Sequence, residues 1–333
     1  MKRFIQGIGS ITLLLSILVG CGSSESTEET ASENGEQLTK VKQITNWFAQ
    51  PDFGGLYAAL EKGYYEEAGL DMTIESGGPQ ISEIQIVASG EAQFGMASGD
   101  EILVAREQGL PIVAIAALYQ TDPQVLLYHK DEPIQDVNDL NGRTVYVASG
   151  AMYWEYLKNN YQLDNVKEMA FTGQFTSFIN DKTSLSQAYM TTAPFLLEKQ
   201  GVDVDYLLVK DSGYENYADV LFTTEKFLKE NPDTVKAYVE ATVKGWDYYQ
   251  TNYEEINQNV ISKENPDLEP DAMKFTSETL MDLVFGGDAA DHGVGYMTKE
   301  RWETLAHQLT DVGVLSEEIN VDEVFTTEFL PNS

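Results

Sequence analysis

Cysteine, histidine and basic residues are all scarce in this chain of 333 residues. A single cysteine excludes a disulfide framework and any multi-cysteine zinc or iron–sulfur site, and three histidines leave little room for a histidine-rich metal site. Lysine and arginine number 21 against 54 aspartates and glutamates, which gives a formal net charge of -33. A body this acidic is repelled by phosphate backbones, so we expect no nucleic-acid partner. The scarcity of cysteine and histidine leads us to expect no metal, and we likewise expect no cofactor.

Apolar residues, in contrast, are plentiful enough for a packed core. Hydrophobic residues make up 42% of the chain and aromatic residues 11%, which argues against wholesale disorder. The chain is too long for one ordinary domain, so two are expected.

The first 21 residues have the composition of a targeting segment. Two basic residues precede the apolar run ITLLLSILV, which is shorter than the roughly 20 apolar residues that a membrane-spanning helix needs. The run ends in LVGC, which resembles the lipobox of bacterial lipoproteins, where the cysteine becomes the new N-terminus and carries lipid. The alternative is a buried lone cysteine. We expect residues 1–20 to be a signal peptide and Cys21 to anchor the protein on the extracytoplasmic side of the cell membrane.

Residues 22–39 read GSSESTEETASENGEQLT, with five glutamates and no aromatic residue. Such a stretch cannot bury enough apolar surface to offset its chain entropy. We therefore expect residues 21–39 to form a lipidated cysteine followed by a disordered tether, with the folded body starting near Lys40.

Extended and helical patterns alternate along the body, and the last third is mostly helical. Short connections between them predict βαβ units on largely parallel sheets. The expected strands are 41–49, 71–75, 93–97, 112–118, 123–130, 143–148, 166–171, 185–190, 206–209 and 218–224. The expected helices are 54–68, 80–89, 101–108, 152–161, 194–200, 270–284 and 299–312, with a further one that starts at Asn231-Pro232.

Two rounds of this alternation and a helical tail predict two lobes that exchange chain segments. We expect residues 40–125 and 222–333 to form lobe one and residues 126–221 to form lobe two, with the strands 123–130 and 218–224 crossing between them. Ligands of open α/β sheets bind beyond the carboxyl ends of the strands. A cleft between the lobes, closed by hinge motion, is therefore the expected small-molecule site.

Short segments of the body resemble one protein family. They are NWF at 46–48, GLYAA at 55–59, EKGYY at 61–65, GLD at 69–71, GEAQFG at 90–95 and DLNGRTV at 139–145. They resemble the substrate-binding proteins of ABC importers related to the fungal thiamine-pyrimidine synthase, and the resemblance covers about residues 41–315. Bacterial members include binding proteins for thiamine pyrimidine precursors, riboflavin, alkanesulfonates, taurine and nitrate.

This resemblance implies an α/β, two-lobed type II periplasmic-binding-protein fold with a hinge and an interlobe cleft. It also implies that the partners are a small solute, an ABC permease and its cytoplasmic ATPase. We expect a monomer that binds solute and performs no catalysis.

The loops that follow the strands carry aromatic, amide and carboxylate side chains. The residues expected to contact ligand there are Trp47, Phe48, Asp52, Phe53, Ser98, Asp100, Glu101, Tyr119, Gln120, Ser149, Met152, Tyr153, Trp154, Tyr189 and Tyr217. Near the second crossover, Tyr214 and Asp219 are further candidates. Each has a simpler alternative: the aromatic residues could pack in the core, the acidic ones could cap helices, and only one of the neighbours Tyr153 and Trp154 is expected to face the cleft.

Arginine and lysine are absent from these loops. We expect Arg106, Arg143 and Arg301 to lie on helices or at a strand start, away from the cleft. An oxyanion such as a sulfonate usually binds a guanidinium. Flat rings with amide and carboxylate partners instead favour a planar, nitrogen-rich or cationic ligand, foremost a thiamine pyrimidine precursor. Riboflavin, a cationic amine and an alkanesulfonate-type solute remain alternatives.

A pyrimidine-synthase-like enzyme is the rival class. No Ser-His-Asp or Cys-His arrangement is visible, and no histidine lies in the expected cleft loops, so binding is favoured over catalysis.

One departure from the family concerns the ligand. Many members carry a Glu-Pro pair after the strand near Tyr189, where this chain has Ala193-Pro194. The Ala193 side chain accepts no hydrogen bond, so either another carboxylate replaces it or the ligand differs.

Overall fold

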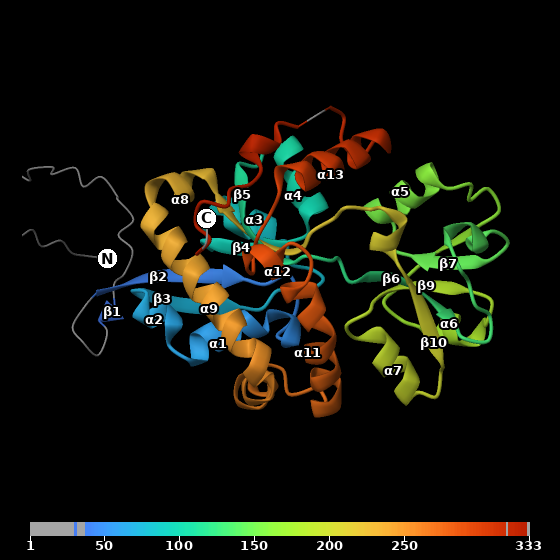
Figure 1. The fold of residues 1–333 in the computed structure, drawn as a ribbon, viewed down its shortest axis with the longest axis horizontal. Helices are drawn as coiled ribbons and strands as arrows, with labels where there is room; N and C mark the ends of the chain where they lie inside the picture. The colour runs from blue at the N-terminus through green and yellow to red at the C-terminus, as the bar shows by residue number, and fades with distance from the viewer. Residues whose placement is uncertain (1–29, 32–36, 318, 332–333) are drawn as a thin grey trace, which may run out of the picture.

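The computed structural model describes residues 30–31, 37–317 and 319–331. The expected signal peptide and Cys21 lie outside the described residues. Among those that are described, no helix combines the length and apolarity needed to cross a bilayer. Figure 1 shows a larger and a smaller α/β body joined by thin connections.

The larger body is built on a six-stranded sheet with the order β1-β2-β4-β11-β5, and β3 pairs with β2. Its strands are β1 Thr30–Ala31, β2 Gln37–Ile44, β3 Leu70–Glu75, β4 Phe94–Ala97, β5 Ile112–Tyr119 and β11 Ala218–Thr224. β2 runs parallel to β3 and β4, whereas β11 runs antiparallel to β4 and β5. Because β2 begins at Gln37, regular structure starts before Lys40.

The smaller body holds a five-stranded sheet with the order β10-β6-β9-β7-β8. Its strands are β6 Gln124–His129, β7 Thr144–Val147, β8 Lys167–Ala170, β9 Leu185–Tyr189 and β10 Val204–Leu208. β7 runs parallel to β8 and β9, and β6 runs antiparallel to β9 and β10.

The two sheets share one topology, since β3-β2-β4-β11-β5 and β8-β7-β9-β6-β10 correspond strand for strand. In each, one strand enters from the other body and runs antiparallel to its neighbours. The expectation of largely parallel sheets is therefore wrong, because both are mixed. The strands expected to cross between the lobes, 123–130 and 218–224, form as β6 and β11, but each belongs to one sheet. The connections are the segments 120–123 and 209–217, which we call the crossovers.

Helices cover both sheets (Figure 1). They are α1 Gly54–Glu61, α2 Tyr64–Glu67, α3 Glu83–Ser89, α4 Gly99–Glu107, α5 Met152–Asn160, α6 Thr176–Asn180, α7 Ala193–Lys199, α8 Glu225–Glu230, α9 Pro232–Ile256, α10 Ser262–Glu264, α11 Pro270–Phe285, α12 Ala289–His292 and α13 Lys299–Asp311. The expected helix 54–68 is split into α1 and α2 at Gly63, whose φ of 74° glycine adopts without strain. Asn231 precedes α9, but its side chain makes no capping hydrogen bond.

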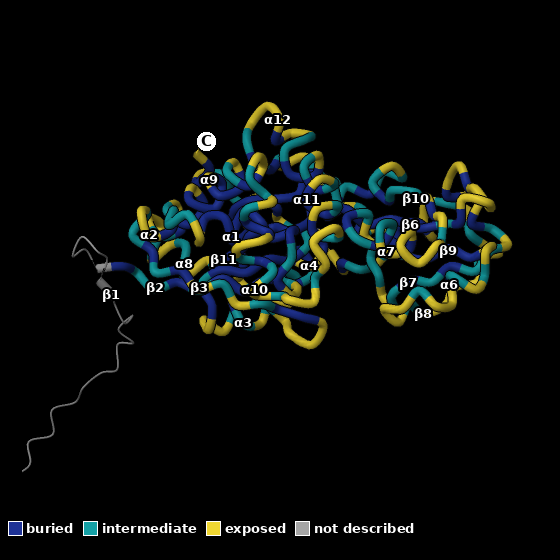
Figure 2. The backbone as a smooth tube through the Cα atoms, turned by 90° about the horizontal axis from the view of Figure 1, so that it is seen from below, coloured by how far each residue is buried: buried dark blue, intermediate teal, exposed yellow. Residues whose placement is uncertain are grey.

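The long helix α9 packs tightly on α1, and this contact positions the first candidate loop. A Cβ atom added at Gly245 would lie 2.2 Å from the carbonyl oxygen of Gly55, so only glycine permits the approach. The short 3-10 helix η1, Pro51–Phe53, leads directly into α1 and is buried throughout. Figure 2 shows buried chain running through the centre of the larger body, where these helices meet. Asp52 on η1 is therefore held by a rigid part of the core.

A second contact joins the two bodies away from the crossovers. Phe195 on α7 stacks on Phe275 of α11 with ring centroids 5.3 Å apart, and Thr276 donates from its hydroxyl to the carbonyl oxygen of Thr191 over 2.8 Å. Lys199 and Glu269 form an ion pair beside them. The loop after β9 is thus packed directly against the larger body.

Candidate ligand site between the two sheets

The strand ends of both sheets meet at the crossovers. After β9, the Met190 amide donates to the carbonyl oxygen of Pro123 over 3.0 Å. At the end of β4, the Gly99 amide donates to the carbonyl oxygen of Tyr217 over 2.9 Å. Each crossover is therefore hydrogen-bonded to a strand end of the sheet that it enters, which places candidate loops of each body beside the crossovers.

Asp52 is a buried carboxylate at this junction, with 6% of its surface exposed. The Tyr119 hydroxyl donates to its Oδ1 over 3.1 Å, whereas the buried Oδ2 has no hydrogen-bond partner among the described residues. Burial raises the pKa of Asp52 to about 6, and the nearby hydroxyls of Tyr119 and Thr191 oppose the rise. Because Tyr119 ends β5 and Thr191 follows β9, this carboxylate lies where the two bodies meet.

Asp219 is a second buried carboxylate, at the start of β11. Its φ of 47° is the one positive value at a non-glycine position in the described part of the chain. Aspartate tolerates this left-handed conformation better than most residues, at a cost on the order of 1 kcal/mol. Asn46 donates from its side-chain amide to Oδ1 over 3.0 Å. Burial and then the charge of Asp52 raise the pKa of Asp219 to about 8.

Asp100 and Asp122 extend this acidic region toward the crossovers. Asn216 joins them: its Oδ1 accepts from the Asp100 amide over 3.0 Å and its Nδ2 donates to Oδ2 of Asp122 over 2.7 Å. The Tyr214 hydroxyl donates to Oδ2 of Asp100 over 2.8 Å. Burial and then the charge of Glu101 raise the pKa of Asp100 to about 7. Within the described residues, no group of three or more histidine, cysteine or acidic side chains is arranged to hold a metal ion.

Sequence reasoning did not single out Asp122, Asn216 or Asn46. The signal that could have found the first two is their position inside the crossovers, where polar side chains sit between two apolar strands. Asn46 is marked by its place after β2.

Three of the expected aromatic residues are exposed: Trp47 at 43%, Phe48 at 50% and Tyr189 at 55%. The Trp47 and Phe48 rings meet edge to face, 5.6 Å apart. Tyr189 reaches solvent, yet protein surrounds it closely enough that desolvation, followed by the charges of Asp122 and Glu101, raises the pKa of its hydroxyl. Large exposed rings at strand ends are typical of binding surfaces.

Other expected aromatic residues are buried among structural partners. Phe53 and Tyr119 belong to the core of the larger body, although the Tyr119 hydroxyl still reaches Asp52. Tyr153 and Trp154 are both buried, and the Trp154 indole donates to Oε2 of Glu168 over 2.8 Å. The Tyr153 hydroxyl donates to Oε1 of Gln187 over 3.1 Å, and the charge of Asp122 in the first crossover acts on it, so its ligand role stays a prediction.

Some of the remaining residues expected to contact ligand have structural partners, and others are exposed or half-buried. Ser98 donates from its hydroxyl to Oε2 of Glu101 over 2.8 Å and forms the capping box of α4, so these residues have the helix-capping role that was the simpler alternative. Gln120 is buried and donates to the carbonyl oxygen of Tyr296 over 3.0 Å. Ser149 is exposed and Met152 half-buried at the start of α5.

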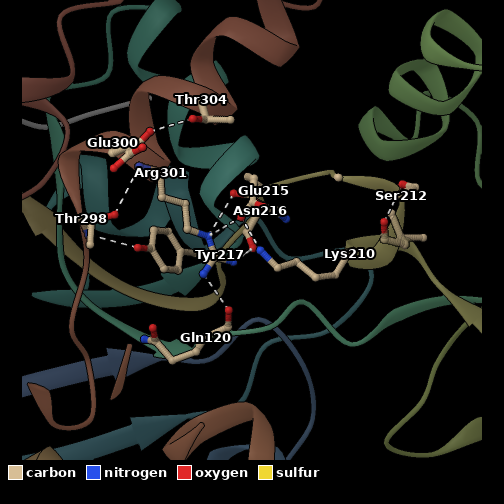
Figure 3. Close-up of polar contacts among 12 residues, drawn as sticks. Gln120, Lys210, Ser212, Glu215, Asn216, Tyr217, Thr298, Glu300, Arg301 and Thr304 are labelled. Carbon is tan, nitrogen blue, oxygen red and sulfur yellow. Dashed lines mark hydrogen bonds and ion pairs between the residues drawn. The ribbon is translucent and has the colours of Figure 1, made fainter. Parts of the chain in front are cut away.

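Arg301 lies on a helix, α13, as expected, but its guanidinium contacts both crossovers. Figure 3 shows its guanidinium between the crossovers and α13. It donates to the carbonyl oxygens of Gln120 (2.7 Å), Glu215 (3.3 Å) and Asn216, and it lies over the ring of Tyr217, 3.9 Å from the centroid. Only 11% of its side chain is exposed. The fork is therefore engaged by backbone, and Tyr217 is buried beneath it.

Comparison with known proteins identifies the family. Residues 50–256 match the model of the NMT1/THI5 like family. The chain belongs to this family.

Two relatives align over nearly the whole chain. The Riboflavin-binding protein RibY of Chloroflexus aurantiacus is 25% identical over 99% of each chain. The Formylaminopyrimidine-binding protein of Halalkalibacterium halodurans is 22% identical over 95% of this chain and 97% of its own. Among solved structures, the periplasmic aliphatic sulphonate binding protein SsuA from Escherichia coli superposes with a TM-score of 0.69 at 10% identity, over 88% of this chain and 94% of that one. The α/β periplasmic-binding-protein fold expected from the sequence is thereby confirmed.

Proposed function

We propose that this protein is an extracytoplasmic solute-binding protein of an ABC importer that captures a planar nitrogen heterocycle between its two lobes. One observation carries this proposal. Exposed aromatic rings and buried carboxylates lie near the crossovers, whereas the guanidinium of Arg301 is already hydrogen-bonded to backbone carbonyl oxygens. Two relatives named for binding riboflavin and formylaminopyrimidine, both flat heterocycles, support it.

The ring of the solute would contact the exposed aromatic residues Trp47, Phe48 and Tyr189. Offset or edge-to-face contacts of this kind contribute about 0.5–1.5 kcal/mol each beyond the burial of area. The carboxylates of Asp52 and Asp219 would accept hydrogen bonds from ring N–H or exocyclic amine groups. Because these groups come from both bodies and a crossover, the solute would bind the closed arrangement better than the open one and so shift the equilibrium toward it.

Among such solutes we place a thiamine pyrimidine precursor first, ahead of riboflavin and a cationic amine. An alkanesulfonate is disfavoured because three of the five N–H donors of Arg301 are used by the carbonyl oxygens of Gln120, Glu215 and Asn216, and the Glu215 carboxylate lies 3.5 Å from its Nε. The expected lobe limits, 40–125 with 222–333 and 126–221, stay part of this proposal with a shift of a few residues, because β6 of the smaller body begins at Gln124 and β11 of the larger body begins at Ala218. We also propose that Cys21 carries the lipid anchor and that a permease with its ATPase receives the solute from a monomer.

Binding without turnover distinguishes this proposal from a pyrimidine-synthase-like activity. The described acidic groups at the site are not accompanied by a histidine or cysteine in the contacts above, so no nucleophile–base pair is in place.

Mass spectrometry of small molecules released from the denatured, purified protein tests the proposal. We expect a flat heterocycle in stoichiometric amount. Riboflavin, 4-amino-2-methylpyrimidine, choline and taurine are then titrated separately by tryptophan fluorescence. Saturable binding of a heterocycle that is recovered chemically unchanged supports the proposal. Tight taurine binding without any response to the heterocycles, or conversion of the bound compound, would overturn it.

A further inference from the structure

We propose that Asp52 and Asp219 together form a subsite for a planar cationic group, such as an amidinium or a protonated aminopyrimidine. This inference rests on the proposed function and adds a requirement for positive charge at the same site. Such a subsite would bind cationic heterocycles more tightly than neutral ones of the same shape.

Both carboxylates lie near Tyr119. Ala218 of β11 pairs with Tyr119 of β5, which places the backbone of the next residue, Asp219, beside this tyrosine. The Tyr119 hydroxyl donates to Oδ1 of Asp52 over 3.1 Å. The charges of Asp52 and Asp219 both act on Tyr119, and of the charged groups acting on Asp219, Asp52 has the largest effect. The two acids therefore share one neighbourhood, one on η1 and one at the start of β11.

Neither carboxylate has a cationic partner. No lysine or arginine of the described residues forms an ion pair with Asp52 or Asp219. Oδ2 of Asp52 is buried and has no hydrogen-bond partner among them, and Oδ1 of Asp219 accepts only from the neutral Asn46 amide. Two buried like charges without a counterion are costly, so either a proton or a bound cation must neutralise part of the charge.

The groups that face the pair from neighbouring elements are acidic or neutral. They are Tyr119, Thr191 and Tyr249 around Asp52, and Asn46, Asp122, Glu101 and Tyr119 around Asp219. Arg301 acts on Asp122, but its donors are turned to backbone carbonyl oxygens. The local field therefore favours a positive group over an anion.

Planar N–C–N cations fit the pair better than a point charge does. An amidinium or a protonated aminopyrimidine offers parallel N–H donors that carboxylate oxygens accept in a forked geometry. The left-handed conformation of Asp219 is consistent with this role, because strained residues are retained where the surrounding structure positions a functional group.

Binding of a cation would also displace a proton. With pKa values of about 6 for Asp52 and about 8 for Asp219, the pair holds roughly one proton at neutral pH. A cation that binds the doubly ionised pair releases that proton, so its affinity should rise as the pH is raised from about 5.5 to about 8.5.

Calorimetric titration of the full chain with two probes of the same shape, benzamidinium and the neutral benzamide, tests the subsite. We expect benzamidinium to bind at least about tenfold more tightly at neutral pH, and to release a proton that is seen as a dependence of the heat on the buffer. Asp52→Asn and Asp219→Asn should each remove most of this preference, whereas Asp164→Asn, an exposed acid on the other body, should keep it.

Equal binding of the two probes, absence of binding by both, or a preference that survives both substitutions would overturn the proposal. Riboflavin is titrated separately, because it distinguishes a failure of the cationic subsite from a failure of the heterocycle site. If this neutral heterocycle binds and benzamidinium does not, the cationic subsite fails and the heterocycle site stands. If benzamidinium, riboflavin and 4-amino-2-methylpyrimidine all fail to bind, both proposals fail.

Discussion

Two charged regions flank the crossovers, and they differ in how completely their charge is partnered. Arg301 is nearly buried, yet three backbone carbonyl oxygens and the face of Tyr217 surround its guanidinium. Asp52 and Asp219 are also buried, yet they repel each other and one carboxylate oxygen has no partner among the described residues.

This difference separates a structural charge from one that is open to a ligand. A buried ion that is partnered by backbone carbonyl oxygens and a carboxylate, as Arg301 is, stabilises the conformation that holds it. A buried ion with an unused acceptor lowers the stability of the empty protein and leaves an interaction for a solute to complete. The same contrast explains why the presence of a guanidinium near the crossovers does not favour an oxyanion.

Removing the partnered charge should have the largest effect on stability. Arg301→Ala leaves the carbonyl oxygens of Gln120, Glu215 and Asn216 without a donor, and we expect the free energy of unfolding to fall by about 3 kcal/mol. Urea denaturation followed by circular dichroism measures this. Arg301→Lys is the matched control: it keeps the charge but not the fork, so it should recover only part of the loss. A loss of less than about 1 kcal/mol in the alanine variant would contradict the assigned role.

Removing an unpartnered charge should instead stabilise the empty protein, in a way that depends on pH. The folded pKa of Asp219 is about 8, above the unfolded value near 3.8, so its folded form favours the protonated carboxyl. Its contribution to stability is lost as the pH rises toward and through about 8. We expect the urea midpoint of the wild type to fall between about pH 4 and pH 8, since Asp52 and Asp100 act in the same direction.

Asp219→Asn should reduce this decline, because asparagine tolerates the left-handed conformation and carries no charge. At about pH 9 the variant should be more stable than the wild type by roughly 1–2 kcal/mol. If the urea midpoints of the two proteins depend on pH in the same way, Asp219 does not have the raised pKa in the folded protein that we describe.

Loss of an exposed ring should affect binding and leave stability almost unchanged. Trp47→Ala is expected to weaken binding of a planar heterocycle about tenfold, from lost stacking and lost area, while the free energy of unfolding changes by less than about 0.5 kcal/mol. Met169→Ala, at another exposed apolar position on β8, is the control and should leave affinity unchanged. Because Trp47→Ala removes one of the tryptophans whose fluorescence would be followed, the affinities of both variants are measured by calorimetry. Equal affinities for both variants would remove Trp47 from the site.

The smallest effect is expected where charges are partnered but exposed. Lys199 at the end of α7 and Glu269 just before α11 pair at the surface, where water and salt screen the attraction and leave little net stabilisation. Lys199→Ala should therefore change the urea midpoint little and the affinity not at all. A large change in affinity would mean that this contact, and not only the crossovers, governs how the lobes close.

Local patterns predicted most elements but not their long-range partners. The strands 93–97 and 112–118 and the helix 101–108 appear nearly as expected, because apolar periodicity is a local property. Strand direction is not local, and nothing near Ala218 marks β11 as antiparallel. Likewise, Arg301 meets Gln120 across 181 positions of sequence, and only the folded arrangement reveals that contact.

The candidate site was predictable in the same partial sense. Loops after strands identified Trp47, Asp52 and Tyr189, because the fold sends strand ends to one edge. The burial of Tyr153 and Trp154 was not predictable, since the indole hydrogen bond to Glu168 depends on where β8 lies relative to α5.

A crystal structure of the protein with the solute that it retains on purification tests the central claim most directly. The account predicts a flat ring beside Trp47 or Tyr189, with an N–H group of the solute donating to Oδ2 of Asp52. A solute oxyanion held by Arg301, or a solute bound outside the space between the two lobes, would contradict it.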